Sequence, residues 1–196
     1  LVAGERFGVI RDHFRRAGVA AWSCDTAADE SGDSRFHIQG DWERIIPSRR
    51  WRGIIIHPVC TALSVSGNWV YAKGKAKWLE RVASAAYVDM LWELCRDNAD
   101  RVCFENPVGV IPTMTTLGSP SQVIQPWQFG DDASKATGYW LWKLPHLIAH
   151  PADRCAGRKV EHPPGSGRIV ERWSNQTDSG QNRLTPDRKG EEGKRA

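Results

Sequence analysis

Two short segments of this chain end in side chains that can do covalent chemistry. The apolar run Ile54–Ile56 leads through a proline to Cys60, and the apolar run Val102–Phe104 leads directly to Glu105 and Asn106. In an α/β sheet, the loops at the carboxyl ends of neighbouring strands face one crevice, so we expect the thiol and the carboxyl group to meet there. A thiolate and an acid in one crevice can add a nucleophile to an electron-poor ring while protonating that ring.

The elements that must position these groups alternate between strand-like and helical patterns. We predict five strands in the first part of the chain, Leu1–Ala3, Ala20–Asp25, His37–Gly40, Gly53–Ile56 and Val102–Glu105. Helical spacing predicts a helix over Val9–Ala17, stopped by Gly18, and a long amphipathic helix over Lys75–Arg96. The apolar face of the long helix is expected to contain Leu79, Val82, Ala83, Ala86, Met90, Leu91 and Leu94. This β-α-β succession predicts an α/β fold with a doubly wound, Rossmann-like sheet.

The later part of the chain has a different character. Ile111–Ser121 is rich in threonine, proline and glycine, so it is predicted to be a loop, and Gln122–Trp127 and Ala136–Trp142 are strand-like. From Ala152 onward, glycine, proline and charged residues dominate. Asn175–Ala196 has almost no apolar residue and is predicted to be disordered. We therefore expect one folded domain over residues 1–150 and an irregular, partly disordered segment over residues 151–196.

Composition narrows the class of protein. The chain has 196 residues and a net charge of +4, which is compatible with a polyanionic partner but does not require one. Its five cysteines form no Cys-x-x-Cys pair, so the spacing predicts no zinc site and no disulfide framework, and it favours a reduced, cytoplasmic setting. No segment approaches the ~18 consecutive apolar residues of a membrane span, and no signal peptide is visible. Cys103 lies inside a predicted strand and is expected to be part of the core.

The first predicted strand is followed by a glycine-containing turn and then directly by a helix. Gly4 and Gly8 belong to this turn, which can bring backbone N–H groups and a helix N-terminus against a ligand. Asp25 ends the next strand about 20 residues on, the spacing at which such folds bind ribose hydroxyls. Asp41 follows the third strand. Its carboxylate can accept a hydrogen bond from an exocyclic amine such as that of adenine, or it can cap the helical turn at Trp42.

Six motifs follow one another in a fixed order along the chain. They are Leu1-Val2-Ala3-Gly4-Glu5-Arg6-Phe7-Gly8-Val9-Ile10-Arg11-Asp12, Ala21-Trp22-Ser23-Cys24-Asp25, His37-Ile38-Gln39-Gly40-Asp41, His57-Pro58-Val59-Cys60-Thr61, Glu105-Asn106-Pro107 and Gln125-Pro126-Trp127-Gln128-Phe129-Gly130. Together they resemble the small phage and prophage proteins related to cytosine-5 DNA methyltransferases. The resemblance covers roughly Leu1–Pro145 and resumes around Arg172–Leu184.

The resemblance implies a fold and a cofactor. The fold would be the S-adenosylmethionine-dependent methyltransferase type of doubly wound sheet, with residues 1–150 as a catalytic domain that lacks a target-recognition domain. The loop from Ala3 to Gly8 would hold the methionine part of S-adenosylmethionine, Asp25 the ribose and Asp41 the adenine amine. The full set of implied cofactor-binding residues is Ala3, Gly4, Glu5, Gly8, Asp25, Asp41 and Pro58, and no metal is implied.

The implied reaction is methylation of carbon-5 of cytosine in DNA, in a bacterial or phage-infected cell. Cys60 would add to carbon-6, Glu105 would hydrogen-bond ring nitrogen-3 and the exocyclic amine, and Asn106 would hold the loop. Carbon-5 is too poor a nucleophile to take a methyl group unaided. Addition at carbon-6 makes it enamine-like, and protonation at nitrogen-3 lowers the cost of that addition. The DNA would be single-stranded or would have the cytosine flipped out of the duplex. His57 lies three residues from Cys60 along an extended turn and is not assigned as a base.

Two other functions stay open. An amino-group methyltransferase of adenine or cytosine would need an Asn/Asp-Pro-Pro-aromatic loop, and Asn106-Pro107-Val108-Gly109 lacks the second proline and the aromatic residue. A degenerate protein could keep the fold and bind nucleic acid without turnover. It would use basic residues that could equally form a solvated helix face and a charged loop, namely Arg11, Arg15, Arg16, Arg49, Arg50 and Arg52.

Overall fold

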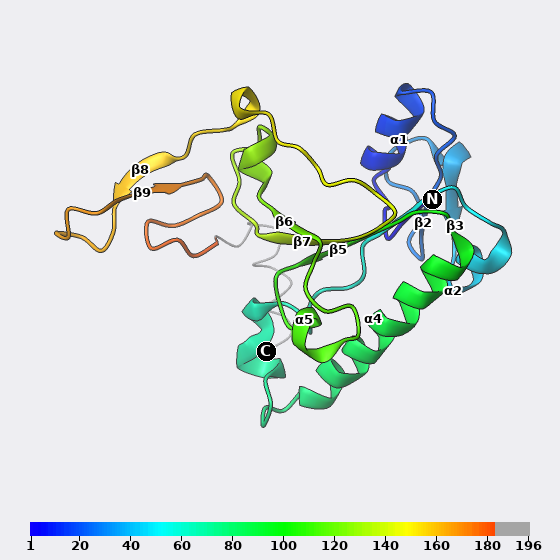
Figure 1. Ribbon diagram of the computed structural model, residues 1–196, viewed down its shortest axis with the longest axis horizontal. Coiled ribbons are helices and arrows are strands. Elements are labelled where there is room, and N and C mark those ends of the chain that lie inside the picture. The colour runs from blue at the N-terminus through cyan, green and yellow to red at the C-terminus, as the bar shows by residue number, and fades with distance from the viewer. Residues whose placement is uncertain (183–196) are drawn as a thin grey trace. The chain divides into compact units, whose positions relative to one another are not determined.

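The computed structural model of the chain describes residues 1–182, and its centre is a seven-stranded mixed sheet (Figure 1). The strand order is β3-β2-β1-β4-β5-β7-β6; β1 to β5 pair in parallel, and β7 runs antiparallel to β5. The strands are β1 Val2–Ala3, β2 Ser23–Asp25, β3 His37–Gln39, β4 Ile54–Ile56, β5 Val102–Pro107, β6 Gln122–Ile124 and β7 Thr137–Trp142. The predicted α/β class is confirmed, and the mostly parallel sheet is compatible with a Rossmann-like fold.

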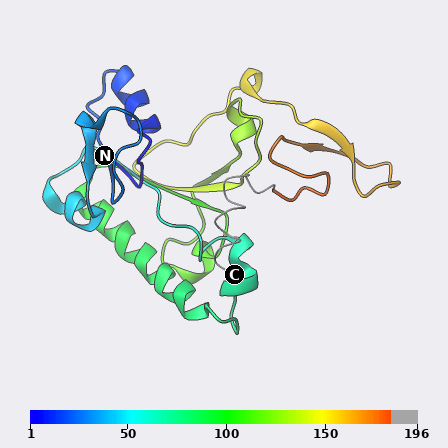
Figure 2. The ribbon, with the colours of Figure 1, turned by 180° about the vertical axis from the view of Figure 1, so that it is seen from behind.

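Helices cover both faces of this sheet. Helix α1 connects β1 to β2, and the long helix α4 connects β4 to β5. Figures 1 and 2 show these two helices on opposite faces of the sheet. The helices of this part of the chain are α1 Val9–Arg16, α2 Trp42–Ile45, α3 Asn68–Tyr71, α4 Trp78–Asn98 and α5 Ile111–Met114. Because α5 lies within Ile111–Ser121, the prediction that this whole segment is a loop is wrong.

The hydrophobic core lies between the sheet and α4. On the sheet side, alternate residues of the central strands point into it, as the period of two requires, and Phe104 packs edge-on against Trp92 and Trp140 with ring centroids 6.2 and 6.1 Å apart. Burial of such apolar area is the main stabilising contribution to the fold. The fully or nearly buried members include Ala3, Cys24, Ile54, Ile56, Val102, Phe104, Ala85, Val88, Leu91 and Cys95.

The predicted buried face of α4 is only partly right: Leu91 is buried and Leu94 packs against the core, but the other large apolar residues of that face are exposed. Leu79 is 78% exposed, and Val82 and Met90 are each 40% exposed. The stripe that faces the protein consists instead of Arg81, Ala85, Val88, Leu91 and Cys95. Charged residues are rarely buried without partners, so a pattern search places an arginine on the solvent face. Here the loop after β4 supplies the partners of Arg81, and that pairing selects the other face of the helix.

Helix α1 also buries an arginine and exposes apolar residues. Val9 is 68% exposed and Phe14 is 37% exposed, whereas Arg11 is completely buried. The helix begins at Val9, as predicted, and ends at Arg16, one residue before the predicted end. Gly18, with φ of +81°, donates its N–H to the carbonyl oxygen of Arg15, and Val19 donates its N–H to that of Phe14, so the helix ends in a Schellman motif.

The chain divides into two compact units. The first contains Leu1–Val123 and Thr137–His146, and the second contains Ile124–Ala136 and resumes at Leu147. The division therefore differs from the predicted single boundary near residue 150, because the segment 124–136 groups with the later part of the chain.

The second unit contains more regular structure than its composition suggested. Its strands β8, Arg158–Glu161, and β9, Ile169–Arg172, form an antiparallel hairpin. Trp127 and Trp173 stack with ring centroids 4.9 Å apart. Residues up to 182 of the stretch predicted to be disordered are described and include a bridge between Gln176 and Asn182. The prediction for residues 183–196 lies outside the described residues.

Candidate functional site

The ends of β4 and β5 bring a carboxylate against an imidazole. In the parallel register of these strands, Ile56 pairs with Phe104, so the next residues, His57 and Glu105, stand side by side. Nδ1 of His57 lies 2.9 Å from Oε2 of Glu105, and the two side chains are only 24% and 15% exposed. Sequence reasoning assigned no role to His57. The register that places it beside Glu105 is a property of the sheet and leaves no signal in either segment alone.

The loops that follow these two strands are tied together. Nδ2 of the fully buried Asn106 donates to the carbonyl oxygen of Pro58 at 3.2 Å, and the N–H of Val110 donates to the carbonyl oxygen of Leu63 at 2.9 Å. A Cβ on Gly109 would lie 2.0 Å from that same Leu63 oxygen, so only glycine allows this approach. The loop that carries Cys60 and the strand end that carries Glu105 are therefore joined, and the approach of the thiol to the carboxyl group stays a prediction. Asn106 holds the loop.

Cys60 differs from the buried cysteines of the sheet and of α4. Burial raises the pKa of Cys24, Cys95 and Cys103 to about 12, so these thiols stay protonated at neutral pH. Cys103 is in the core, as predicted. Cys60 and Cys155 are the partly exposed thiols of the chain, and of these two it is Cys60 that follows a strand of the sheet.

Arg81 of α4 holds the loop that follows Cys60. Its Nε donates to the carbonyl oxygen of Ala62 at 2.6 Å, Nη1 to Oδ1 of Asn68 at 2.7 Å and Nη2 to the carbonyl oxygen of Ser64 at 3.3 Å. The arginine is 2% exposed, and no carboxylate among the described residues pairs with it. A buried charge of this kind is tolerated only when its donors are satisfied, so Arg81 is committed to this loop. Sequence reasoning missed it.

The polar groups of the turn after β1 form hydrogen bonds with other groups of the same chain. The N–H groups of Gly4 and Glu5 both donate to the carbonyl oxygen of Cys24, at 2.8 and 3.2 Å. The buried carboxylate of Glu5 accepts hydrogen bonds from the N–H groups of Ile10 and Arg11, at 2.5 and 3.2 Å. The prediction that such N–H groups face a ligand is therefore wrong for these four, because Glu5 itself caps the positive end of α1.

Gly8 is required by the packing of a buried arginine. It has φ of +65°, and a Cβ there would lie 2.3 Å from Nη2 of Arg11. That guanidinium makes five hydrogen bonds and leaves no donor for nucleic acid, so Arg11 belongs neither to a solvated face nor to a basic patch. Its partners are the carboxylates of Asp12 and Asp29 and the hydroxyls of Ser23 and Ser31.

The same turn packs against the end of β4. Ala3 is fully buried, and its carbonyl oxygen accepts the N–H of His57 at 3.0 Å. Gly4 has φ of +80°, and a Cβ there would lie 2.8 Å from the carbonyl oxygen of His57 and 3.0 Å from a ring carbon of Trp42. The ends of β1, β4 and β5 thus meet around His57.

The two acidic residues at the ends of β2 and β3 have different surroundings. Oδ1 of the half-buried Asp25 accepts the N–H of Ala27 at 2.9 Å, and its Oδ2 has no partner among the described residues. Asp41 accepts the N–H of Glu43 at 3.0 Å and is the N-cap of α2, so the capping interpretation is confirmed. A role for Asp41 toward an adenine amine stays a prediction.

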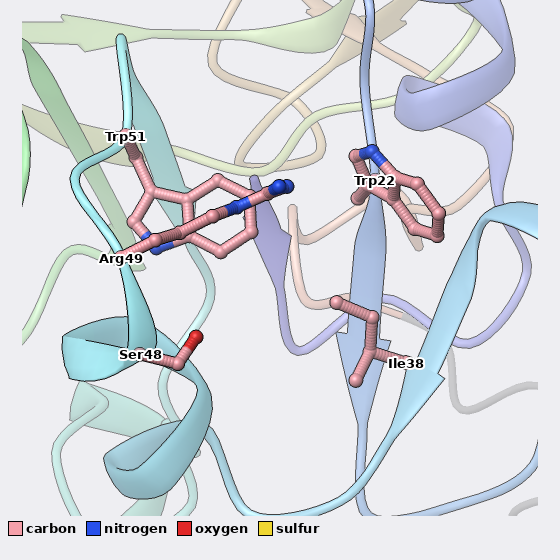
Figure 3. Close-up of a pocket in the computed structure, with 5 residues that line it drawn as sticks. All are labelled: Trp22, Ile38, Ser48, Arg49 and Trp51. Atoms are coloured by element: carbon pink, nitrogen blue, oxygen red, sulfur yellow. The ribbon is translucent and has the colours of Figure 1, made fainter.

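A separate hollow lies at the other end of the strands (Figure 3). It has a volume of about 230 Å³ and is lined by Trp22, Ile38, Ser48, Arg49 and Trp51. Because Trp22 precedes β2 and Trp51 precedes β4, the cavity is at the amino ends of the strands and apart from the thiol and the carboxylate. Figure 3 shows Arg49 lying over the ring of Trp51, and its guanidinium carbon is 4.0 Å from the ring centroid.

Three further observations concern metal binding, membrane spanning and similarity to known proteins. Within residues 1–182, no group of three or more His, Cys, Asp or Glu side chains is arranged to hold a metal ion. In the same part of the chain, no helix has the length and apolar character needed to cross a membrane. Comparison of the chain with protein-family models, with curated proteins and with solved structures gave no match. The fold and the geometry therefore define an α/β protein with a thiol, an imidazole and a carboxyl group at adjoining strand ends.

Proposed function

We propose that the protein is an S-adenosylmethionine-dependent DNA methyltransferase that methylates carbon-5 of cytosine through a cysteine adduct. The observation that carries the proposal is the junction of the Cys60 loop with the Glu105 strand end, held by Asn106. These ends lie beside the point where the strand order reverses, between β1 and β4, and ligands of open α/β sheets bind at such points. A doubly wound sheet of the methyltransferase type is also what the ordered motifs imply.

The residues at the first strand ends fit S-adenosylmethionine better than a dinucleotide. A pyrophosphate binds to free N–H groups at a helix N-terminus, and Glu5 occupies those of α1. S-adenosylmethionine has no phosphate and carries a positive sulfonium, so a carboxylate in the turn is compatible with it. Asp25, with one unoccupied oxygen, would bind the ribose hydroxyls, and Asp41 the adenine amine. The surrounding backbone would come from Ala3, Gly4, Gly8 and Pro58.

The chemistry follows from the thiol and the acid. The cofactor, when bound, supplies an electrophilic methyl group. The thiolate of Cys60 forms a bond to carbon-6, the ring electrons move toward carbon-5, and Glu105 donates a proton to nitrogen-3. Carbon-5 would then use the ring electron pair to bond to the methyl carbon, and the sulfur of the cofactor would keep the electrons of the broken sulfur–carbon bond as a neutral thioether. Loss of the carbon-5 proton to water breaks the bond between sulfur and carbon-6, and the nitrogen-3 proton returns to Glu105.

The amino-group alternative fits this geometry less well. Its loop would have to present Asn106 to the exocyclic amine. Here Asn106 is fully buried, and its Nδ2 is bound to the carbonyl oxygen of Pro58. Its side chain is therefore committed to holding the loop.

Binding of nucleic acid without turnover is the second candidate, because part of the basic surface is unpaired. Arg16, Arg49 and Arg52 are exposed, and none of them pairs with a carboxylate among the described residues, whereas Arg50 pairs with Asp100 at 3.0 Å. Unpaired arginines can contact phosphates, and affinity that rests on such contacts falls steeply with salt.

A trapped adduct tests the proposal. The full chain is incubated with S-adenosylmethionine and oligonucleotides, single- and double-stranded, that contain fluorocytosine. Fluorine replaces the proton that must leave carbon-5, so the adduct persists and runs as a denaturant-resistant protein–DNA band. We expect this band in the unaltered chain and in Cys155→Ser, which alters the other partly exposed thiol, and no band in Cys60→Ser or Cys60→Ala.

Two results would contradict the proposal. A band that persists in Cys60→Ala shows that another residue is the nucleophile. Salt-sensitive DNA binding without any band, on either form of DNA, supports the second candidate function.

A further inference from the structure

His57 has one partnered and one unpartnered ring nitrogen. Its Nδ1 lies 2.9 Å from Oε2 of Glu105, and its Nε2 is buried without a hydrogen-bond partner among the described residues. Its backbone is fixed on both sides, because its N–H donates to the carbonyl oxygen of Ala3 and its own carbonyl oxygen packs against Gly4. The ring therefore has little freedom to find another partner for Nε2.

This asymmetry decides where the imidazole proton resides. A neutral imidazole carries one N–H, on either nitrogen. A proton on Nε2 would bury a donor without an acceptor and would also set the lone pair of Nδ1 against Oε2, whereas a proton on Nδ1 leaves only the lone pair of Nε2 unpaired. An imidazolium would carry the same unsatisfied N–H. A proton on Nδ1 is instead donated to Oε2 of Glu105, so the geometry selects the neutral tautomer protonated at Nδ1.

That tautomer commits one oxygen of the carboxyl group. Oε2 accepts from His57 whether or not Glu105 is protonated, so a proton on Glu105 must sit on Oε1. Among the described residues, His57 is the only hydrogen-bond partner of this carboxyl group. Oε1 is therefore the oxygen left for a ligand.

We propose that His57 is a positioning residue that keeps the acidic proton of Glu105 on Oε1, from which it is delivered to nitrogen-3 of the cytosine. This inference rests on the proposed function. As Sγ of Cys60 bonds to carbon-6, the Oε1 proton passes to nitrogen-3, and His57 keeps its own proton throughout. On this basis, His57 acts through Glu105 and not as the base that activates Cys60.

Two variants separate positioning from simple packing. His57→Asn keeps an N–H donor at the δ position of the side chain, whereas His57→Leu fills similar space without a donor. At saturating fluorocytosine DNA, we expect His57→Leu to slow adduct formation by on the order of tenfold to a hundredfold, with little change in the half-saturating DNA concentration. His57→Asn is expected to recover most of that rate. Circular dichroism checks that both variants are folded.

The second part of the test measures the protonation of His57 directly and does not depend on the reaction. In the full chain labelled with ¹⁵N-histidine, long-range ¹H–¹⁵N spectra should show His57 protonated at Nδ1 and bare at Nε2, with the signal assigned by its loss in His57→Asn. If the adduct forms, any one of three results overturns this inference alone. These results are a proton on Nε2, an imidazolium, and equal rates for the Leu and Asn variants. The Nδ1 tautomer without any adduct in the unaltered chain overturns the proposed function, and this inference with it.

Discussion

The turn after β1 and the paired ends of β4 and β5 lie at one edge of the sheet, but they treat their polar groups in opposite ways. In the turn, the carboxylate of Glu5 and the guanidinium of Arg11 are buried and fully partnered by their own chain. At the ends of β4 and β5, Nε2 of His57 and Oδ1 of Asn106 are buried without partners. Buried polar groups that stay unpaired cost stability. The turn is therefore stabilised within its own chain, whereas the β4 and β5 ends, where we propose the site, keep buried polar atoms unpaired.

The largest expected change in the free energy of unfolding is in the turn after β1 and the arginine that it buries. Arg11→Met removes a fully buried guanidinium and leaves Asp29, whose side chain is 3% exposed, without its cation. Breaking one partner of a buried pair costs about 3 to 5 kcal/mol of the free energy of unfolding. Urea unfolding measures it, with Arg16→Met on the exposed face of the same helix as the control. A loss below about 1 kcal/mol for Arg11→Met would contradict the structural role given to the turn.

A smaller effect is expected from a pair of glycines that flank α1. Gly8 and Gly18 both have positive φ, so alanine costs about 1 to 2 kcal/mol at either position. At Gly8 the added Cβ would also meet Arg11 at 2.3 Å, whereas at Gly18 it meets nothing within 4 Å. We expect Gly8→Ala to cost about 2 to 4 kcal/mol because of this overlap. Equal midpoints of thermal unfolding for the two variants would show that Arg11 is not locked in place.

The smallest change in the free energy of unfolding is expected at the ends of β4 and β5. Asn106→Leu gives up the bond to the carbonyl oxygen of Pro58, but it also removes an oxygen that has no partner. These changes oppose each other, so we expect the free energy of unfolding to change by no more than about 1 kcal/mol. Adduct formation, in contrast, should fall, because the Cys60 loop loses its tie to β5. A large loss of stability in urea unfolding would mean that this end of the sheet is structural as well.

Much of the framework could be predicted because it depends on local chemistry. The apolar runs before Cys60 and Glu105 predict strands, and the turn residues after them predict loops at one edge of the sheet. Gly18 ends α1 because only a residue that readily adopts positive φ fits there. The buried faces of the helices could not be predicted in this way. Arg11 and Arg81 are inside because segments outside their own helices supply most of their acceptors.

The sequence by itself determined that a cysteine follows one strand and a glutamate lies at the end of another in an α/β protein, since apolar runs and prolines act within a few residues. The tertiary structure alone decided that His57 stands beside Glu105, that Glu5 caps α1 and that Arg81 holds the Cys60 loop. Each of these contacts depends on strand register or on the position of a separate segment. Such long-range geometry is set by packing of the whole unit, and no local pattern contains it.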